Sequence, residues 1–135
     1  MLSNVLQSST IPILEQVVNF AQSRHNVLAG NLANVDTPGY RTRDLPPQVF
    51  QARLRSAIEE RNRSQQPIAP TSLSSADPIS GVGAAANSIL FHDNNNRGLE
   101  QEVAAIADNE LQHNMAIALL TSQLRLLQTA ISEKA

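Results

Sequence analysis

The 135-residue sequence contains no cysteine and no tryptophan, and its only aromatic residues are Phe20, Tyr40, Phe50 and Phe91. The absence of cysteine excludes a disulfide framework and a cysteine-ligated zinc site. Because aromatic side chains supply much of the buried area in compact domains, we expect a small helical assembly rather than a thick globular core. No apolar run approaches the about 20 residues that a membrane-spanning helix needs.

Positive charge is also scarce, since 10 Lys and Arg residues stand against 12 Asp and Glu residues. This balance argues against a nucleic-acid binder. The basic residues nevertheless cluster in the middle of the chain, at Arg41, Arg43, Arg53, Arg55, Arg61 and Arg63. Acidic residues interrupt this cluster, so a solvated face or an acidic protein partner is the preferred reading. The N-terminus lacks the pattern of a cleavable signal peptide, and any export is expected to use a route that does not read one.

The last third of the chain has no proline and no glycine after Gly98, and it is predicted to form one long helix over 99–131. At about 1.5 Å per residue this helix is roughly 50 Å long. Gly98 or Asn96 is the expected N-cap. Residues at alternating spacings of three and four form the seam of a coiled coil. The seam consists of Val103, Ile106, Glu110, His113, Ile117, Leu120, Leu124, Leu127 and Ile131.

A second seam with the same spacing lies in a helix predicted over 12–34. Its residues are Leu14, Val18, Ala21, His25, Leu28 and Leu32. A neighbouring stripe of Ile13, Val17, Phe20 and Val27 widens the apolar face beyond what one helix covers. The expected fold class is therefore mainly α, with the two long terminal helices pairing as a coiled coil. An irregular, partly disordered middle segment joins them.

The middle of the chain is dominated by turn and loop residues, within a single domain over 1–135. Residues 35–61 are expected to hold a turn and a short helix over 49–61. Pro46-Pro47 is expected to block another helix start in the middle of 41–47. Pro38-Gly39 is the preferred centre of a type II turn, and Asn34 is expected to end the first helix in the left-handed conformation. A flexible linker is expected over 62–98, with a polar turn at 91–97.

No pattern in the sequence supports catalysis or a cofactor. The stretch 81–86 (GVGAAA) matches a dinucleotide fingerprint, but no strand precedes it and no βαβ unit surrounds it. Part of 93–104 matches a calcium loop, but Ala104 stands where a bidentate acid belongs. The three histidines lack metal-ligand spacing. We therefore expect no enzyme, no metal, no cofactor and no small-molecule substrate.

Two of the histidines, His25 and His113, each interrupt an apolar seam. One reading is that both are partly exposed and have no special role. The other is that they lie near each other, where they set the register of the two helices and make their packing sensitive to pH.

Residues 31–40 (NLANVDTPGY) closely resemble the NIAN-x-x-TPGY signature of bacterial flagellar rod and hook proteins. The matching positions are Asn31, Ala33, Asn34, Thr37, Pro38, Gly39 and Tyr40. Arg24, residues 43–45 and several positions within 93–131 extend the match. The short chain favours the proximal-rod members, of which two remain open, over distal-rod and hook proteins with their large inserted β-domains. In one departure, Gly98 stands where the family usually has a capping aspartate.

The resemblance implies a structural protein of the flagellar basal body. Such a protein is exported by the flagellar type III apparatus without a cleaved signal. It assembles with itself, with other rod subunits and with basal-body proteins into the rod that crosses the periplasm. Two alternatives from other classes are a soluble coiled-coil adaptor or export chaperone, and a nucleic-acid binder that uses the arginine cluster.

Overall fold

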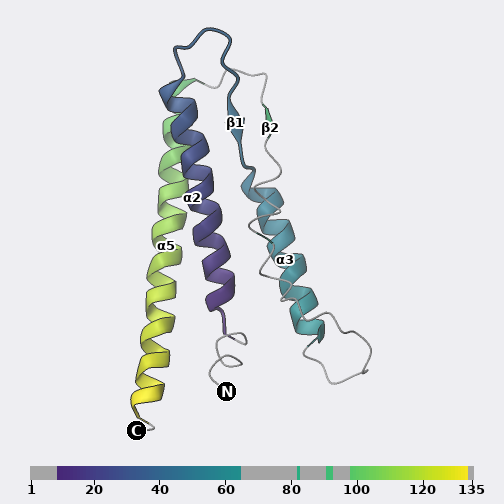
Figure 1. The fold of residues 1–135 in the computed structure, drawn as a ribbon, viewed down its shortest axis with the longest axis vertical. Coiled ribbons are helices and arrows are strands. Elements are labelled where there is room, and N and C mark those ends of the chain that lie inside the picture. Colours follow the sequence, from purple (N-terminus) through teal and green to yellow (C-terminus); the bar gives the residue numbers. More distant parts are fainter. Residues whose placement is uncertain (1–8, 65–81, 83–90, 93–97, 134–135) are drawn as a thin grey trace.

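The computed structural model describes residues 9–64, 82, 91–92 and 98–133 (Figure 1). In chain order, the elements are helix α2 (Ile11–Ala33), strand β1 (Arg43–Asp44), helix α3 (Pro47–Ser64), strand β2 (Phe91–His92) and helix α5 (Leu99–Ser132). Helices α2 and α5 lie side by side and run in opposite directions. Side chains of α2, α3 and α5 together line a cavity of about 370 Å³. The prediction of a mainly α fold with paired terminal helices is confirmed. No helix in the described part of the chain is both long enough and apolar enough to span a membrane.

Helix α2 spans Ile11–Ala33, one residue earlier at each end than the predicted 12–34. Pro12 lies in the first turn, where a missing N–H removes no helical hydrogen bond. The helix ends at Asn34, which has φ −111° and ψ 13°, so the expected left-handed cap is wrong. Instead, the side-chain amide of Asn34 donates to the carbonyl of Gly30 at 2.8 Å and satisfies an acceptor of the last turn.

The turn after α2 has the predicted type II geometry. The N–H of Tyr40 donates to the carbonyl of Thr37 at 3.1 Å, which makes Pro38 and Gly39 the central residues. Gly39 has φ +78°, in the left-handed region that a residue with a Cβ enters only under strain. Proline and glycine therefore each occupy the position that their backbone preference suits.

Helix α3 is longer than the short helix predicted over 49–61. It begins at Pro47, because proline is tolerated in a first helical turn, and no helix begins within 41–46. The N–H of Phe50 donates to the carbonyl of Pro46 at 3.4 Å. The helix continues to Ser64, and its last residues correct the start of the linker expected over 62–98.

Strands β1 and β2 pair antiparallel, with Arg43 opposite His92 and Asp44 opposite Phe91. The polar turn predicted over 91–97 is therefore wrong for its first two residues. Strands of two residues are too short to show an alternating pattern in the sequence. The remaining linker and the two cofactor-like matches fall largely in 65–81, 83–90 and 93–97, outside the described residues.

The main apolar core lies between α2 and α3. It consists of Phe20, Leu45, Phe50, Ala57 and Val82, with Ile13, Val17, Val27 and Leu54 packed against it. The rings of Phe20 and Phe50 stack with their centroids 4.1 Å apart and their planes 5° apart. The second stripe predicted on α2 thus packs against α3 and leaves the other side of α2 to α5.

Helix α5 begins after Gly98, one of the two predicted N-caps. The carbonyl of Gly98 accepts the N–H of Gln101 at 2.9 Å, but no side chain caps the helix. Glu100 and Glu102 lie in the first turn, where carboxylates favour the positive end of the helix dipole. With 34 residues against 23 in α2, α5 extends past the N-terminal end of α2 (Figure 1).

Candidate assembly surface

The side chain of Asn31 joins four parts of the chain at the C-terminal end of α2. Its Nδ2 donates to the carbonyl of Arg43 at 2.6 Å and to Oε2 of Glu102 at 3.3 Å. Its Oδ1 accepts the backbone N–H of Arg43 at 3.0 Å and the hydroxyl of Tyr40 at 3.2 Å. Asn31 is only 1% exposed, and both donors and both lone pairs of its amide are used. One side chain therefore holds α2, the signature turn, β1 and α5 together.

A largely buried ion pair also attaches β1 to α2. Nε of Arg24 lies 3.1 Å from Oδ1 of Asp44, and Nη2 lies 3.5 Å from Oδ2. The two side chains are 9% and 14% exposed. Two parallel contacts fix the orientation of the pair as well as its distance. The sequence reading missed this pairing, although both residues lie in the stretches that extend the signature match.

Three residues of α5 at seven-residue intervals are buried: Glu102, Asn109 and Ala116. Glu102 accepts its hydrogen bond from Asn31, as described above, and Nδ2 of Asn109 donates to the carbonyl of Ala21 at 2.8 Å. Two polar residues thus occupy positions that a coiled coil usually fills with apolar side chains. Helix α2 supplies a hydrogen-bond partner for Asn109 and for Oε2 of Glu102, whereas Oε1 of Glu102 has none in the described part of the chain.

This polar row displaces the seam predicted on α5. Beside it, Ile106, His113, Leu120 and Leu127 are half-buried. The other predicted positions lie one residue beyond the row, and Val103, Ile117, Leu124 and Ile131 are 49%, 40%, 48% and 55% exposed. Glu110 is exposed as well. We call Val103, Ile117, Leu124 and Ile131 the outer stripe. Its positions fall on the same seven-residue spacing as the buried row, with Glu110 between Val103 and Ile117, so spacing alone did not distinguish the stripe from the row.

The predicted seam on α2 is covered unevenly. Ala21 and Leu28 are buried, Leu14, Val18 and Leu32 are half-buried, and His25 is exposed. Within the signature, Asn31 is buried, Asn34 and Tyr40 are half-buried, and Ala33, Thr37, Pro38 and Gly39 are exposed. A role for the exposed turn in contacts between subunits stays a prediction.

His25 and His113 line the same surface cavity of about 200 Å³, together with Asn109 and Glu110. The structure thus brings the two histidines to one place, His25 from α2 and His113 from α5. Their suggested effects on register and on pH sensitivity stay predictions.

Within the described part of the chain, every strongly exposed large hydrophobic residue belongs to α5. These residues are Leu99, Val103, Leu111, Met115, Ile117, Leu119, Leu124, Leu126 and Ile131. A concentration of exposed apolar side chains on one element favours contact with another protein. Helix α5 is therefore the main candidate for an assembly surface.

The arginine cluster is partly engaged within the chain. Nη1 of Arg61 donates to the carbonyl of Ser9 at 3.2 Å, and Nη1 of Arg63 lies 3.1 Å from Oε2 of Glu60. A nucleic-acid site needs basic side chains that are free to meet phosphates. These contacts give no support to that use of the cluster.

A family model described as flagella basal body rod protein matches residues 19–41, which include the second half of α2 and the turn at Pro38-Gly39. The flagellar basal body rod protein FlgB of Salmonella typhimurium is 30% identical over 119 residues, 82% of this chain and 84% of the relative. The chain belongs to the FlgB family of flagellar basal body rod proteins. FlgB proteins of Aquifex aeolicus and Bacillus subtilis are 26% and 22% identical, over 93% and 94% of this chain and 94% and 96% of the relatives.

Family membership confirms the resemblance and decides between the two short proximal-rod members. The FlgB name denotes a structural protein, which agrees with the expectation that the chain is not an enzyme. The soluble adaptor or export chaperone finds no support among these relatives.

Proposed function

We propose that this chain is a structural subunit of the proximal rod of the flagellar basal body. Its partners there are further copies of itself, other rod subunits and other basal-body proteins. The observation that supports this most directly is the outer stripe on α5, whose apolar residues remain about half exposed although α2 packs beside them. Apolar side chains at a seven-residue repeat favour contact with a neighbouring helix.

The buried polar contacts between α2 and α5 fix the orientation of the outer stripe relative to α2. Asn31 and the carbonyl of Ala21 hold Glu102 and Asn109 toward α2, which turns the outer stripe away from it. Held in this orientation, the outer stripe of one subunit can contact a surface of the next subunit that is not its own outer stripe. Contacts between unlike surfaces that do not close on themselves build a helical tube.

The outer stripe is tested by Leu124→Asp. Because Leu124 is 48% exposed, we expect the isolated chain to stay folded, with its stability changed by about 0.5 kcal/mol or less. We expect the variant to be absent from isolated basal bodies and to leave the cells non-motile. Gln128→Asp makes the same change of charge at an exposed polar position of α5 and should assemble normally. Normal incorporation of the Leu124 variant would contradict the proposal.

Family membership also supports a place in the part of the rod that crosses the periplasm, and export by the flagellar type III apparatus without a cleaved signal. Mass spectrometry of the chain recovered from basal bodies tests the export route. An intact N-terminal segment is the expected result, and a shortened chain would contradict it.

A further inference from the structure

We propose that the cavity between α2, α3 and α5 receives the outer stripe of a second copy of this chain, the next subunit of the rod. This inference rests on the proposed function and names the surface that the outer stripe contacts. The cavity of about 370 Å³ is lined mainly by apolar side chains, and we call it the three-helix cavity. Its lining includes Leu14 and Val17 of α2, Phe50 and Leu54 of α3, and Met115 and Leu119 of α5.

The three-helix cavity is open to solvent along α5. Met115 and Leu119, which line it, are 59% and 50% exposed. Two polar lining residues, Gln51 and Gln112, are exposed as well. An apolar cavity of about 150 Å³ holds one benzene molecule, so this cavity has room for about two aliphatic side chains. An open apolar recess between helices favours the apolar face of another helix, whose anchors recur at spacings of three, four and seven.

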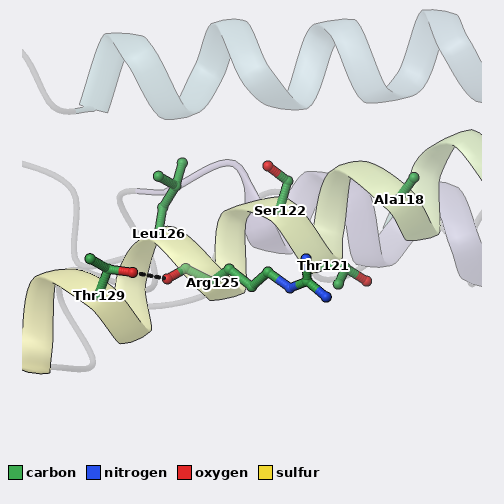
Figure 2. Close-up of a pocket in the computed structure, with 6 residues that line it drawn as sticks. All are labelled: Ala118, Thr121, Ser122, Arg125, Leu126 and Thr129. Atoms are coloured by element: carbon green, nitrogen blue, oxygen red, sulfur yellow. Dashed lines mark hydrogen bonds between the residues drawn. The ribbon is translucent and has the colours of Figure 1, made fainter.

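The apolar wall of the cavity continues along α5 toward its C-terminal end. Ser122 follows Met115 by seven residues and Leu126 follows Leu119 by seven, so the four lie on one side of the helix. We call these four residues the inner flank. Figure 2 shows Ser122 and Leu126 pointing to the side on which α3 lies. Leu126 is 61% exposed, so a helix seated in the cavity meets a further apolar side chain beyond it.

The outer stripe lies on the opposite side of α5 from the inner flank. Ile117 of the outer stripe is two positions from Met115 and two from Leu119, about 200° around the helix from either one. A subunit therefore cannot bring its own outer stripe to its own cavity. It can offer the stripe to one neighbour and the cavity to another. Contacts between two such unlike surfaces continue from copy to copy as a helical array when the rotation does not close.

The exposed residues favour a second copy as the occupant of the cavity. Within the described part of the chain, every strongly exposed large hydrophobic residue belongs to α5, and the outer stripe contains four of these residues. They lie in one line at multiples of seven residues, which is the pattern of anchors that a recess between helices accepts. A rod that contains several copies of this chain presents this stripe on each neighbouring copy.

Gln51→Trp tests the cavity. Gln51 is exposed on α3, so a larger side chain there should fill the opening of the cavity and leave the isolated chain folded, which circular dichroism checks. Ala52→Trp is the matched control, because Ala52 is the next residue of α3, is exposed and lies outside the cavity lining. Each variant competes with the unaltered chain in the same cells. We expect Gln51→Trp to enter isolated basal bodies about tenfold less often than the unaltered chain, and Ala52→Trp to enter equally.

Cysteine pairs test the occupant, because the chain has no cysteine of its own. Gln51→Cys is combined in one chain with Ile117→Cys, Leu124→Cys or Ile131→Cys, and basal bodies that contain each variant are oxidised. Contact between stripe and cavity predicts a ladder of cross-linked chains for at least one pair, and no cross-link between chains for any single variant. Asn19→Cys replaces Gln51→Cys in the control pairs, which should give no ladder, because Asn19 is exposed about 200° around α2 from the cavity residue Val17.

Three results would overturn this inference. The first is equal incorporation of the two tryptophan variants, and the second is basal bodies that contain the cysteine pairs but give no ladder. The third is a cross-link from position 51 to a protein other than this chain, identified by mass spectrometry. None of the three contradicts the proposed function, which normal incorporation of Leu124→Asp contradicts separately.

Discussion

Replacing Asn31 with alanine removes four hydrogen bonds from a buried position and leaves their partners in place. An intramolecular hydrogen bond contributes about 1 kcal/mol net, but a buried group left without its partner costs about 1–3 kcal/mol. Glu102 is affected most, because Oε1 already lacks a hydrogen-bond partner in the described part of the chain and Oε2 would lose its own. We expect Asn31→Ala to lower the free energy of unfolding by about 3–5 kcal/mol, near the upper end for one substitution.

Urea unfolding followed by circular dichroism measures this loss. Asn34→Ala is the matched control, because it makes the same chemical change in the same signature. The Asn34 amide donates to the carbonyl of Gly30, and its Oδ1 accepts the exposed hydroxyl of Thr37 at 3.5 Å. Both contacts are local, so we expect its replacement to cost about 1 kcal/mol or less. Equal losses for the two variants would refute the reasoning that the Asn31 contacts between elements dominate.

The same experiment separates the buried charge from the lost hydrogen bonds. Glu102 is 1% exposed, and a carboxylate without a partner is far more costly to bury than an amide. In the Asn31→Ala background, we therefore expect Glu102→Gln to recover about 1 kcal/mol or more. No recovery would mean that the buried charge contributes little to the loss.

Three further substitutions test other contacts by the same unfolding measurement. Gly39→Val forces a β-branched residue to φ +78° and should cost about 1–2 kcal/mol and block assembly into the rod; normal motility would contradict this. Gly98→Asp places a capping carboxylate where no atom lies within 4 Å of an added Cβ, and should raise stability by a few tenths to about 1 kcal/mol. Arg24→Met should cost about 2–4 kcal/mol because it leaves the Asp44 carboxylate largely buried; adding Asp44→Leu should recover most of this, and an unchanged loss would argue against the pair.

Much of the fold follows from local patterns. The two long helices, the Gly98 start of α5 and the Pro38-Gly39 turn were all predicted, because spacing and backbone preference act within a few residues. The pairing of the helices was also predicted, since each carries an apolar face that needs a partner. The signature residues supplied the family, which the relatives then showed.

The structure between α2 and α5 was predicted less accurately. The pairing of Arg43 with His92 joins positions far apart in sequence, and each strand is too short to show a period. Helix α3 extends beyond the predicted 49–61 at both ends, because proline is tolerated in a first helical turn and residues 62–64 continue the helix. The stack of Phe20 on Phe50, which holds α3 against α2, depends on the same long-range geometry.

The sequence by itself determined that α5 has an apolar seam with a seven-residue repeat, but not which row of that seam faces α2. The tertiary structure decided this through hydrogen bonds rather than hydrophobicity. Glu102 meets Asn31, and Asn109 meets the carbonyl of Ala21. Those partners come together only when the helices are antiparallel and in register. A buried polar group is tolerated only where its partner is present. The same contacts leave Val103, Ile117, Leu124 and Ile131 exposed, where they can meet another subunit.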